Sequence, residues 1–185
     1  TLDPEKARAF LTLVHGLSRV LRALPVPVIG RINGACFGAG MEVAAACDMR
    51  IAAESAVFGM PEVRLGLPSV VEAALFPQLI GWGRTRQLVY TGETITAKVA
   101  REWGFVEEVV PAAELDAAVE AMVAPIVASG PRAIRLQKEL VRDWEQLGVG
   151  DAIQAGIRSI GRAYETDEPQ RMLRPLIDRL KKRAR

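Results

Sequence analysis

The strongest constraint on the fold is a succession of short elements in the first third of the chain. Residues 26–32 are an apolar, β-branched run that predicts a strand, and Asn33-Gly34 ends it as a turn. Gly38-Ala39-Gly40 then leads into 41–47 (MEVAAAC), a compact run of small residues that predicts a helix, and 48–53 (DMRIAA) has strand character. This order is typical of a βαβ unit and predicts a parallel sheet.

The pattern around this unit is mostly helical. Asp3-Pro4, followed by an amphipathic stretch to about Ala23, predicts a capped helix. Residues 56–59 and 105–110 predict two further short strands. Between these strands, helices are expected at 69–79, 83–90 and 96–103.

After Pro111 the sequence predicts no further strand. Glycine and proline separate successive amphipathic segments there, and each segment predicts a helix. These helices are expected at 114–129, 131–147, 149–165 and 169–183. We therefore expect an α/β core over 1–110 and a helical region over 111–185.

Charge and cysteine content exclude several classes of function. The 185 residues carry 24 basic and 22 acidic side chains, which gives no reason to expect nucleic acid or a membrane as a partner. Cys36 and Cys47 stand in small, apolar surroundings, so we expect free thiols and a cytoplasmic location. No His/Cys cluster has zinc spacing, and no stretch is long and apolar enough to span a bilayer.

Residues 32–47 and the turn at Pro61 hold the candidate chemistry. Glycines at a helix start let the backbone approach a ligand closely, and the first N–H groups of the helix favour negative charge. Glu42 falls in the first turn, and Glu62 follows Pro61. Each feature also has a purely structural interpretation. The glycines can form a tight turn, Glu42 can simply interact favourably with the helix dipole, and Glu62 can lie in a surface turn. Together, two carboxylates beside an oxyanion site would suit proton transfer next to a carbonyl.

Two longer runs carry a specific resemblance. Residues 27–68 (PVIGRINGACFGAGMEVAAACDMRIAAESAVFGMPEVRLGLP) and 91–111 (TGETITAKVAREWGFVEEVVP) resemble the crotonase superfamily, the enoyl-CoA hydratase/isomerase family. The resemblance implies an α/β chain with the ββα spiral core of the ClpP/crotonase fold, followed by a C-terminal helical region for trimerisation. The family fold has a further half-domain before residue 27, so the core is expected to be N-terminally incomplete.

The resemblance also implies roles for three residues. Ala39 falls where the family supplies an oxyanion-hole N–H, and because the donor is main-chain, alanine can replace the usual glycine. Glu42 and Glu62 match the two acids with which hydratases hold and activate water. The implied reaction is hydration of a 2-enoyl-CoA, with CoA as part of the substrate, no separate cofactor or metal, and assembly into homotrimers or homohexamers. The alternatives are another acyl-CoA reaction, such as double-bond isomerisation or thioester hydrolysis, and a non-catalytic, truncated oligomerising protein.

The chain departs from the family pattern at 69–74. Ser-Val-Val-Glu-Ala-Ala stands where a glycine-rich run is usual, which introduces Glu72. Glu72 is a candidate for a catalytic or specificity role, and its structural alternative is a helix-surface residue. His15 is the only histidine, and because no serine or cysteine motif accompanies it, a catalytic triad is not expected.

Overall fold

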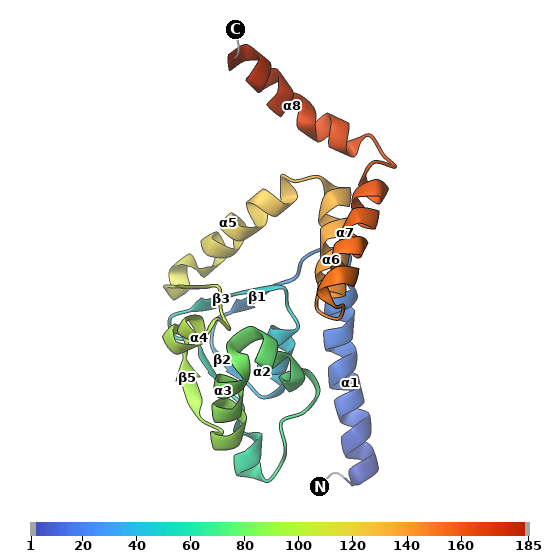
Figure 1. Cartoon of the computed structure of the whole chain (residues 1–185). Helices are drawn as coiled ribbons and strands as arrows, with labels where there is room; N and C mark the ends of the chain where they lie inside the picture. Colours follow the sequence, from blue (N-terminus) through green and yellow to red (C-terminus); the bar gives the residue numbers. More distant parts are fainter. Residues whose placement is uncertain (1–2, 184–185) are drawn as a thin grey trace. The chain divides into compact units, whose positions relative to one another are not determined.

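The computed structural model describes residues 3–183, which fall into two compact units, Thr1–Ala121 and Met122–Arg185 (Figure 1). The first unit contains every strand among the described residues, and the last of these, β6 (Glu108–Val110), ends just before Pro111. The predicted division between residues 110 and 111 thus coincides with the end of the last strand. As a domain boundary, this division stays a prediction.

Six short strands form two sheets in the first unit. The parallel sheet has the order β1-β3-β6, with β1 at Ile29–Ile32 and β3 at Met49–Ala53. The second sheet has the order β2-β4-β5, with β2 at Ala35–Phe37, β4 at Val57–Gly59 and β5 at Thr94–Thr96. Its β2–β4 pair is parallel and its β4–β5 pair is antiparallel. The predicted parallel pairing is therefore confirmed for the first sheet and for β2–β4.

Helices surround these strands. The helix α1 (Pro4–Ala23) begins where the Asp3 side chain accepts a hydrogen bond from the Lys6 N–H at 2.8 Å, and it ends before Pro25. The predicted helix over 69–79 is wrong as one element: a 3₁₀ turn, η2 (Val71–Leu75), precedes a kinked α3. The remaining elements of this unit are α2 (Ala39–Ala45), η1 (Pro61–Leu65), α3 (Phe76–Thr91), α4 (Ala97–Trp103) and η3 (Ala112–Glu114).

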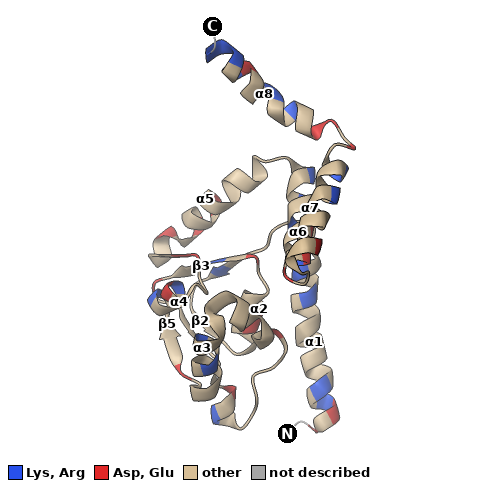
Figure 2. Ribbon diagram, viewed as in Figure 1, with Lys and Arg blue, Asp and Glu red and all other residues tan. Residues whose placement is uncertain are grey.

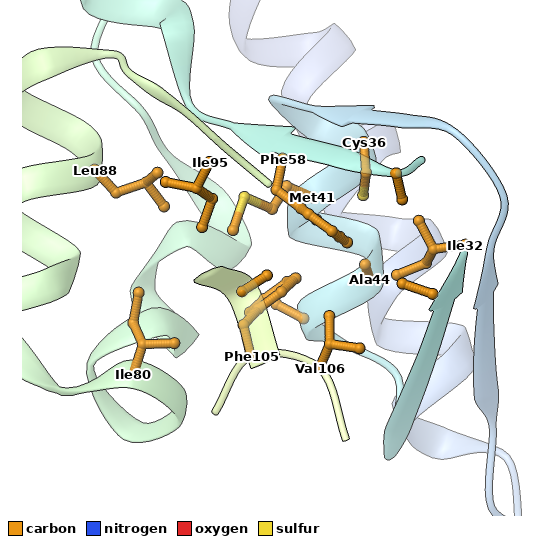
Figure 3. Packing of buried hydrophobic residues seen from close by; sticks show 14 of the residues in the cluster. Ile32, Cys36, Met41, Ala44, Phe58, Ile80, Leu88, Ile95, Phe105 and Val106 are labelled. Atoms are coloured by element: carbon orange, nitrogen blue, oxygen red, sulfur yellow. The ribbon is translucent and has the colours of Figure 1, made fainter. Parts of the chain in front are cut away.

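The helix α2 lies in the middle of the hydrophobic core (Figure 3). Met41 of this helix is fully buried. Alanines fill the rest of the inner face of α2, which lets neighbouring elements approach closely. Phe105 stacks edge-on against Phe58 and Phe76, with ring centroids 5.6 and 5.9 Å apart. Burial raises the pKa of the Cys36 thiol to about 11, so this free cysteine stays protonated and packs as an apolar residue.

The second unit is helical. It holds α6 (Pro131–Trp144), α7 (Val149–Ala163) and α8 (Glu168–Arg183), while α5 (Leu115–Val127) spans the boundary between the units. The Glu168 carboxylate caps α6 by accepting hydrogen bonds from the N–H groups of Arg132 and Ala133, at 3.1 and 2.9 Å. None of the helices described between residues 3 and 183 has the length and apolar character to cross a membrane.

Candidate active site at the end of two parallel strands

Glu42 is held in the first turn of α2, where it is 3% exposed. The turn before it is anchored to β4, because the Gly38 N–H donates to the Gly59 carbonyl at 3.0 Å. The Glu42 N–H donates in turn to the Gly38 carbonyl at 3.0 Å and closes the first turn of the helix. Ala39 is exposed at the first helical position, where its N–H has no acceptor within the helix.

Glu62 lies beside the start of α2, although it belongs to a different element. It lies in η1, just after β4, and β4 pairs in parallel with β2, which ends just before Gly38. Carboxyl ends of parallel strands meet at one edge of a sheet. The two segments therefore come together: a Cβ atom on Gly38 would collide with Oε1 of Glu62. The Ser69 hydroxyl donates to the other oxygen of Glu62, Oε2, at 3.0 Å.

Opposing effects set the pKa of Glu42: burial and nearby charge raise it, and main-chain hydrogen bonds lower it. Desolvation is the largest effect, and the negative charge of Glu62 is the next; together they raise the pKa of Glu42 to about 7. The N–H groups of Ala73 and Val70 bind the carboxylate and lower that pKa without offsetting the rise. A carboxyl group with a pKa near 7 takes up and releases protons at neutral pH, which suits acid–base chemistry.

The predicted site residues lie at one edge of the second sheet. Glu62 packs against Gly38, Ala39 follows Gly38 directly, and Glu42 is one helical turn further on. The structure therefore brings the three together, while their catalytic roles stay predictions. Among residues 3–183, no group of three His, Cys, Asp or Glu side chains is placed to hold a metal ion.

Sequence reasoning named Glu72 as a candidate but did not connect it with His15. Glu72 is 6% exposed, so its interpretation as a helix-surface residue is wrong. His15, for which no role was expected, places Nδ1 2.6 Å from Oε1 of Glu72. The loss of glycines over 69–74 was a signal for Glu72, but no sequence pattern joins it to a histidine 57 positions away.

Replacing Gly38 by alanine tests the packing of Glu62. Gly38 has φ +53 and ψ −124, a conformation that side chains avoid, and the added Cβ would displace the Glu62 carboxylate. We expect Gly38→Ala to lower the free energy of unfolding by about 1–3 kcal/mol in urea denaturation. Gly40→Ala is the matched control: a Cβ at Gly40 meets no atom within 4 Å, so this variant should gain about 0.5–1 kcal/mol from helix propensity. Equal stability of the two variants would contradict the packing.

Comparison with known proteins places this chain in a family. Residues 3–171 match the family model described as enoyl-CoA hydratase/isomerase. The chain is 37% identical to the Bacillus subtilis protein YngF over 169 residues, which are 91% of this chain and 64% of that protein. It is 33% identical to the crotonyl-CoA hydratase of Syntrophomonas wolfei over 181 residues, which are 97% of this chain and 70% of that protein.

A solved structure gives the same result for the fold. The crystal structure of an enoyl-CoA hydratase from Bacillus anthracis matches 96% of this chain with a TM-score of 0.92 and 33% identity. The match covers 69% of that enzyme, so the chain spans about two thirds of the length of these relatives. The chain has the crotonase fold and belongs to the enoyl-CoA hydratase/isomerase family.

Proposed function

We propose that this chain carries the catalytic carboxylates of an enoyl-CoA hydratase, which adds water syn across the double bond of a 2-enoyl-CoA thioester. The observation that carries the proposal is the packing of Glu62 against Gly38, one helical turn from the buried Glu42. The relatives named as crotonyl-CoA and short-chain-enoyl-CoA hydratases, at 33% and 32% identity, support the same reaction.

The turn at Gly38 supplies the electrostatic part of the proposed mechanism. Attack of water on C3 of the substrate moves negative charge onto the thioester oxygen. A main-chain N–H at the start of a helix stabilises such charge, and removal of one such donor typically slows turnover by about 10²–10³-fold. The donor that this chain offers is the main-chain N–H of Ala39, an exposed residue at the first position of α2.

Each of the two glutamates carries out one of the two proton transfers of the reaction. Glu42 orients a water molecule and accepts its proton as the water oxygen bonds to C3. Glu62, in its protonated form, delivers a proton to C2, so both halves of the water molecule are accounted for over the cycle. The proton on Glu42 then returns to Glu62, and the repulsion between the two carboxylates favours one proton on the pair over none.

Assaying the intact protein with two isomeric substrates tests the reaction. With crotonyl-CoA, hydration removes the absorbance of the conjugated thioester; with a 3-enoyl-CoA, isomerisation would create it. We expect loss of conjugation in the first assay, and Glu62→Gln should lower its kcat by about 10²–10⁴-fold, because the amide cannot deliver a proton.

The exposed carboxyl group of Glu54, in the turn after β3, provides the control. Glu54→Gln should keep the parent rate. Gain of conjugation from the 3-enoyl-CoA without hydration of crotonyl-CoA would contradict the proposed reaction. A Glu62→Gln variant with the parent rate would contradict the role of Glu62.

A further inference from the structure

A hydroxyl group holds one oxygen of the Glu62 carboxyl group. Ser69 lies in the segment between η1 and η2, and its Oγ donates to Oε2 of Glu62 at 3.0 Å. The other oxygen, Oε1, lies against Gly38, which directly precedes Ala39 at the start of α2. The two oxygens of Glu62 are therefore in different surroundings, and they can take different parts in a proton transfer.

The backbone between Glu62 and Ser69 folds back on itself, which brings the two side chains together. Gly66 ends η1 in the left-handed conformation, with φ +75, and turns the chain. The N–H of Leu67 then donates to the Glu62 carbonyl at 3.0 Å. Glu62 is thus held through its main chain by Leu67 and through its side chain by Ser69. These two hydrogen bonds leave the carboxyl group little freedom to rotate.

The donor to Glu62 is neutral, in surroundings that hold acids. The helix α2 carries one charged residue, the acid Glu42, and no basic one (Figure 2). In η1 itself, Arg64 directs its Nε to the Thr91 carbonyl at 3.0 Å. A cation beside a carboxyl group favours the ionised form alone. A hydroxyl group can donate to a carboxylate or to the carbonyl oxygen of a neutral acid, so Ser69 can hold Glu62 in both protonation states.

We propose that Ser69 is a positioning residue that directs the proton of Glu62 to Oε1, the oxygen beside Gly38 and Ala39. The inference rests on the proposed function, in which protonated Glu62 is the acid. With the Ser69 hydroxyl bound to Oε2, the proton of the neutral acid lies on Oε1. Ser69 exchanges no proton with the substrate and acts through Glu62. It is the first residue of the stretch 69–74, in which the chain departs from the family pattern.

The proton transfer to C2 gives the hydroxyl group its effect on the rate. The Oε1–H bond breaks as the electron pair of the enolate forms the new C–H bond at C2, and the electron pair of the O–H bond stays on Glu62. Negative charge thus develops on the Glu62 carboxylate. Hydrogen bonds to charged acceptors are stronger than those to neutral ones, so the bond from Ser69 strengthens in the transition state. Its loss should therefore lower kcat and leave KM nearly unchanged.

Replacing the hydroxyl group of Ser69 in the intact protein tests the inference. Ser69→Ala should lower kcat for crotonyl-CoA about 10–100-fold, the factor expected for one hydrogen bond to a charged group. Ser69→Thr keeps the hydroxyl group and should restore most of the parent kcat. Ser69→Cys has a similar shape but only a weak donor, so it should behave like Ser69→Ala. Ser55→Ala makes the same change at an exposed position after β3, and this control should keep the parent rate.

Crystal structures of the variants separate the inference from the proposed function. In Ser69→Thr the Glu62 carboxyl group should stay against Gly38, whereas in Ser69→Ala it should turn away. That result supports the positioning of Glu62 even if the parent protein hydrates no enoyl-CoA, which would contradict the proposed function alone. If hydration is fast, the parent kcat in Ser69→Ala or Ser69→Cys would overturn the inference and leave the proposed function intact. An equal loss of kcat in Ser69→Ala and Ser69→Thr would also overturn it.

Discussion

Replacing Glu42 by glutamine should nearly abolish hydration while making the folded protein more stable at neutral and alkaline pH. Glutamine has the same shape and still offers an oxygen to the N–H groups of Val70 and Ala73, but it cannot take a proton. A single positioned base contributes about 10²–10⁴-fold to turnover. We therefore expect kcat for crotonyl-CoA to fall by that factor, with a much smaller change in KM.

The expected gain in stability follows from the pKa of Glu42. Folding raises this pKa from its ordinary value of 4.5 to about 7, so the folded state binds more protons than the unfolded state between those values. Stability must then fall as pH rises through this interval. Above pH 7 the ionised, buried Glu42 lowers the free energy of unfolding by about 1–3 kcal/mol, and below pH 4.5 this penalty vanishes.

Glutamine at position 42 is neutral at every pH, so the variant should not suffer this penalty. The difference in unfolding free energy between Glu42→Gln and the parent protein should grow from near zero at pH 4.5 to its full value above pH 7. Urea denaturation at several pH values measures it. A variant that is inactive because it is destabilised would show the opposite sign, and equal stabilities at pH 8 would refute the raised pKa.

The site residues were predictable because they lie in local motifs. Gly38 stands in a glycine turn at the start of a helix, and Glu62 follows a proline at the end of a strand. Their proximity was a weaker prediction, because it depends on the parallel pairing of β2 with β4. Residues 35–37 (ACF) are too few for an alternating pattern, so this strand was not predicted. The strand β5 was missed for the same reason.

Residues 69–79 show where tertiary contacts override local preference. Alanine and leucine recur there beside Glu72, and the glycines usual in the family are absent, so a helix was predicted. The segment instead bends at Val71, with φ +38, and sends two N–H groups to Glu42. Such a conflict between propensity and structure is expected at functional sites.

The sequence pattern did not reveal the stabilising role of Arg50. Its replacement should lower the free energy of unfolding more than any other substitution considered. It is 1% exposed in the central strand of the parallel sheet. Its Nε donates to the Phe105 carbonyl at 2.5 Å, and its Nη1 donates to the carbonyls of Ala44 and Cys47 at 3.1 and 2.9 Å. Its Nη2 lies 2.8 Å from Oε1 of Glu107.

Arg50→Met should lower the free energy of unfolding by about 3–5 kcal/mol, because it leaves three main-chain carbonyls and Oε1 of Glu107 without this donor. Two of those acceptors, the carbonyls of Ala44 and Cys47, lie at the C-terminal end of α2, the helix whose first turn holds Glu42. The position of Glu42 therefore depends on a guanidinium group at the opposite end of its helix. We expect turnover to fall even at temperatures where the variant remains folded.

Arg31→Met supplies the matched control, because Arg31 lies on the neighbouring strand β1 and pairs with Asp116 at 2.5 Å on the surface. Exposed pairs contribute about 0–1 kcal/mol, so this variant should unfold within that range of the parent protein. Both substitutions remove one positive charge from the same sheet. A large difference between them in urea denaturation would therefore measure the buried hydrogen bonds of Arg50, whereas similar, small losses would show that α2 does not depend on them.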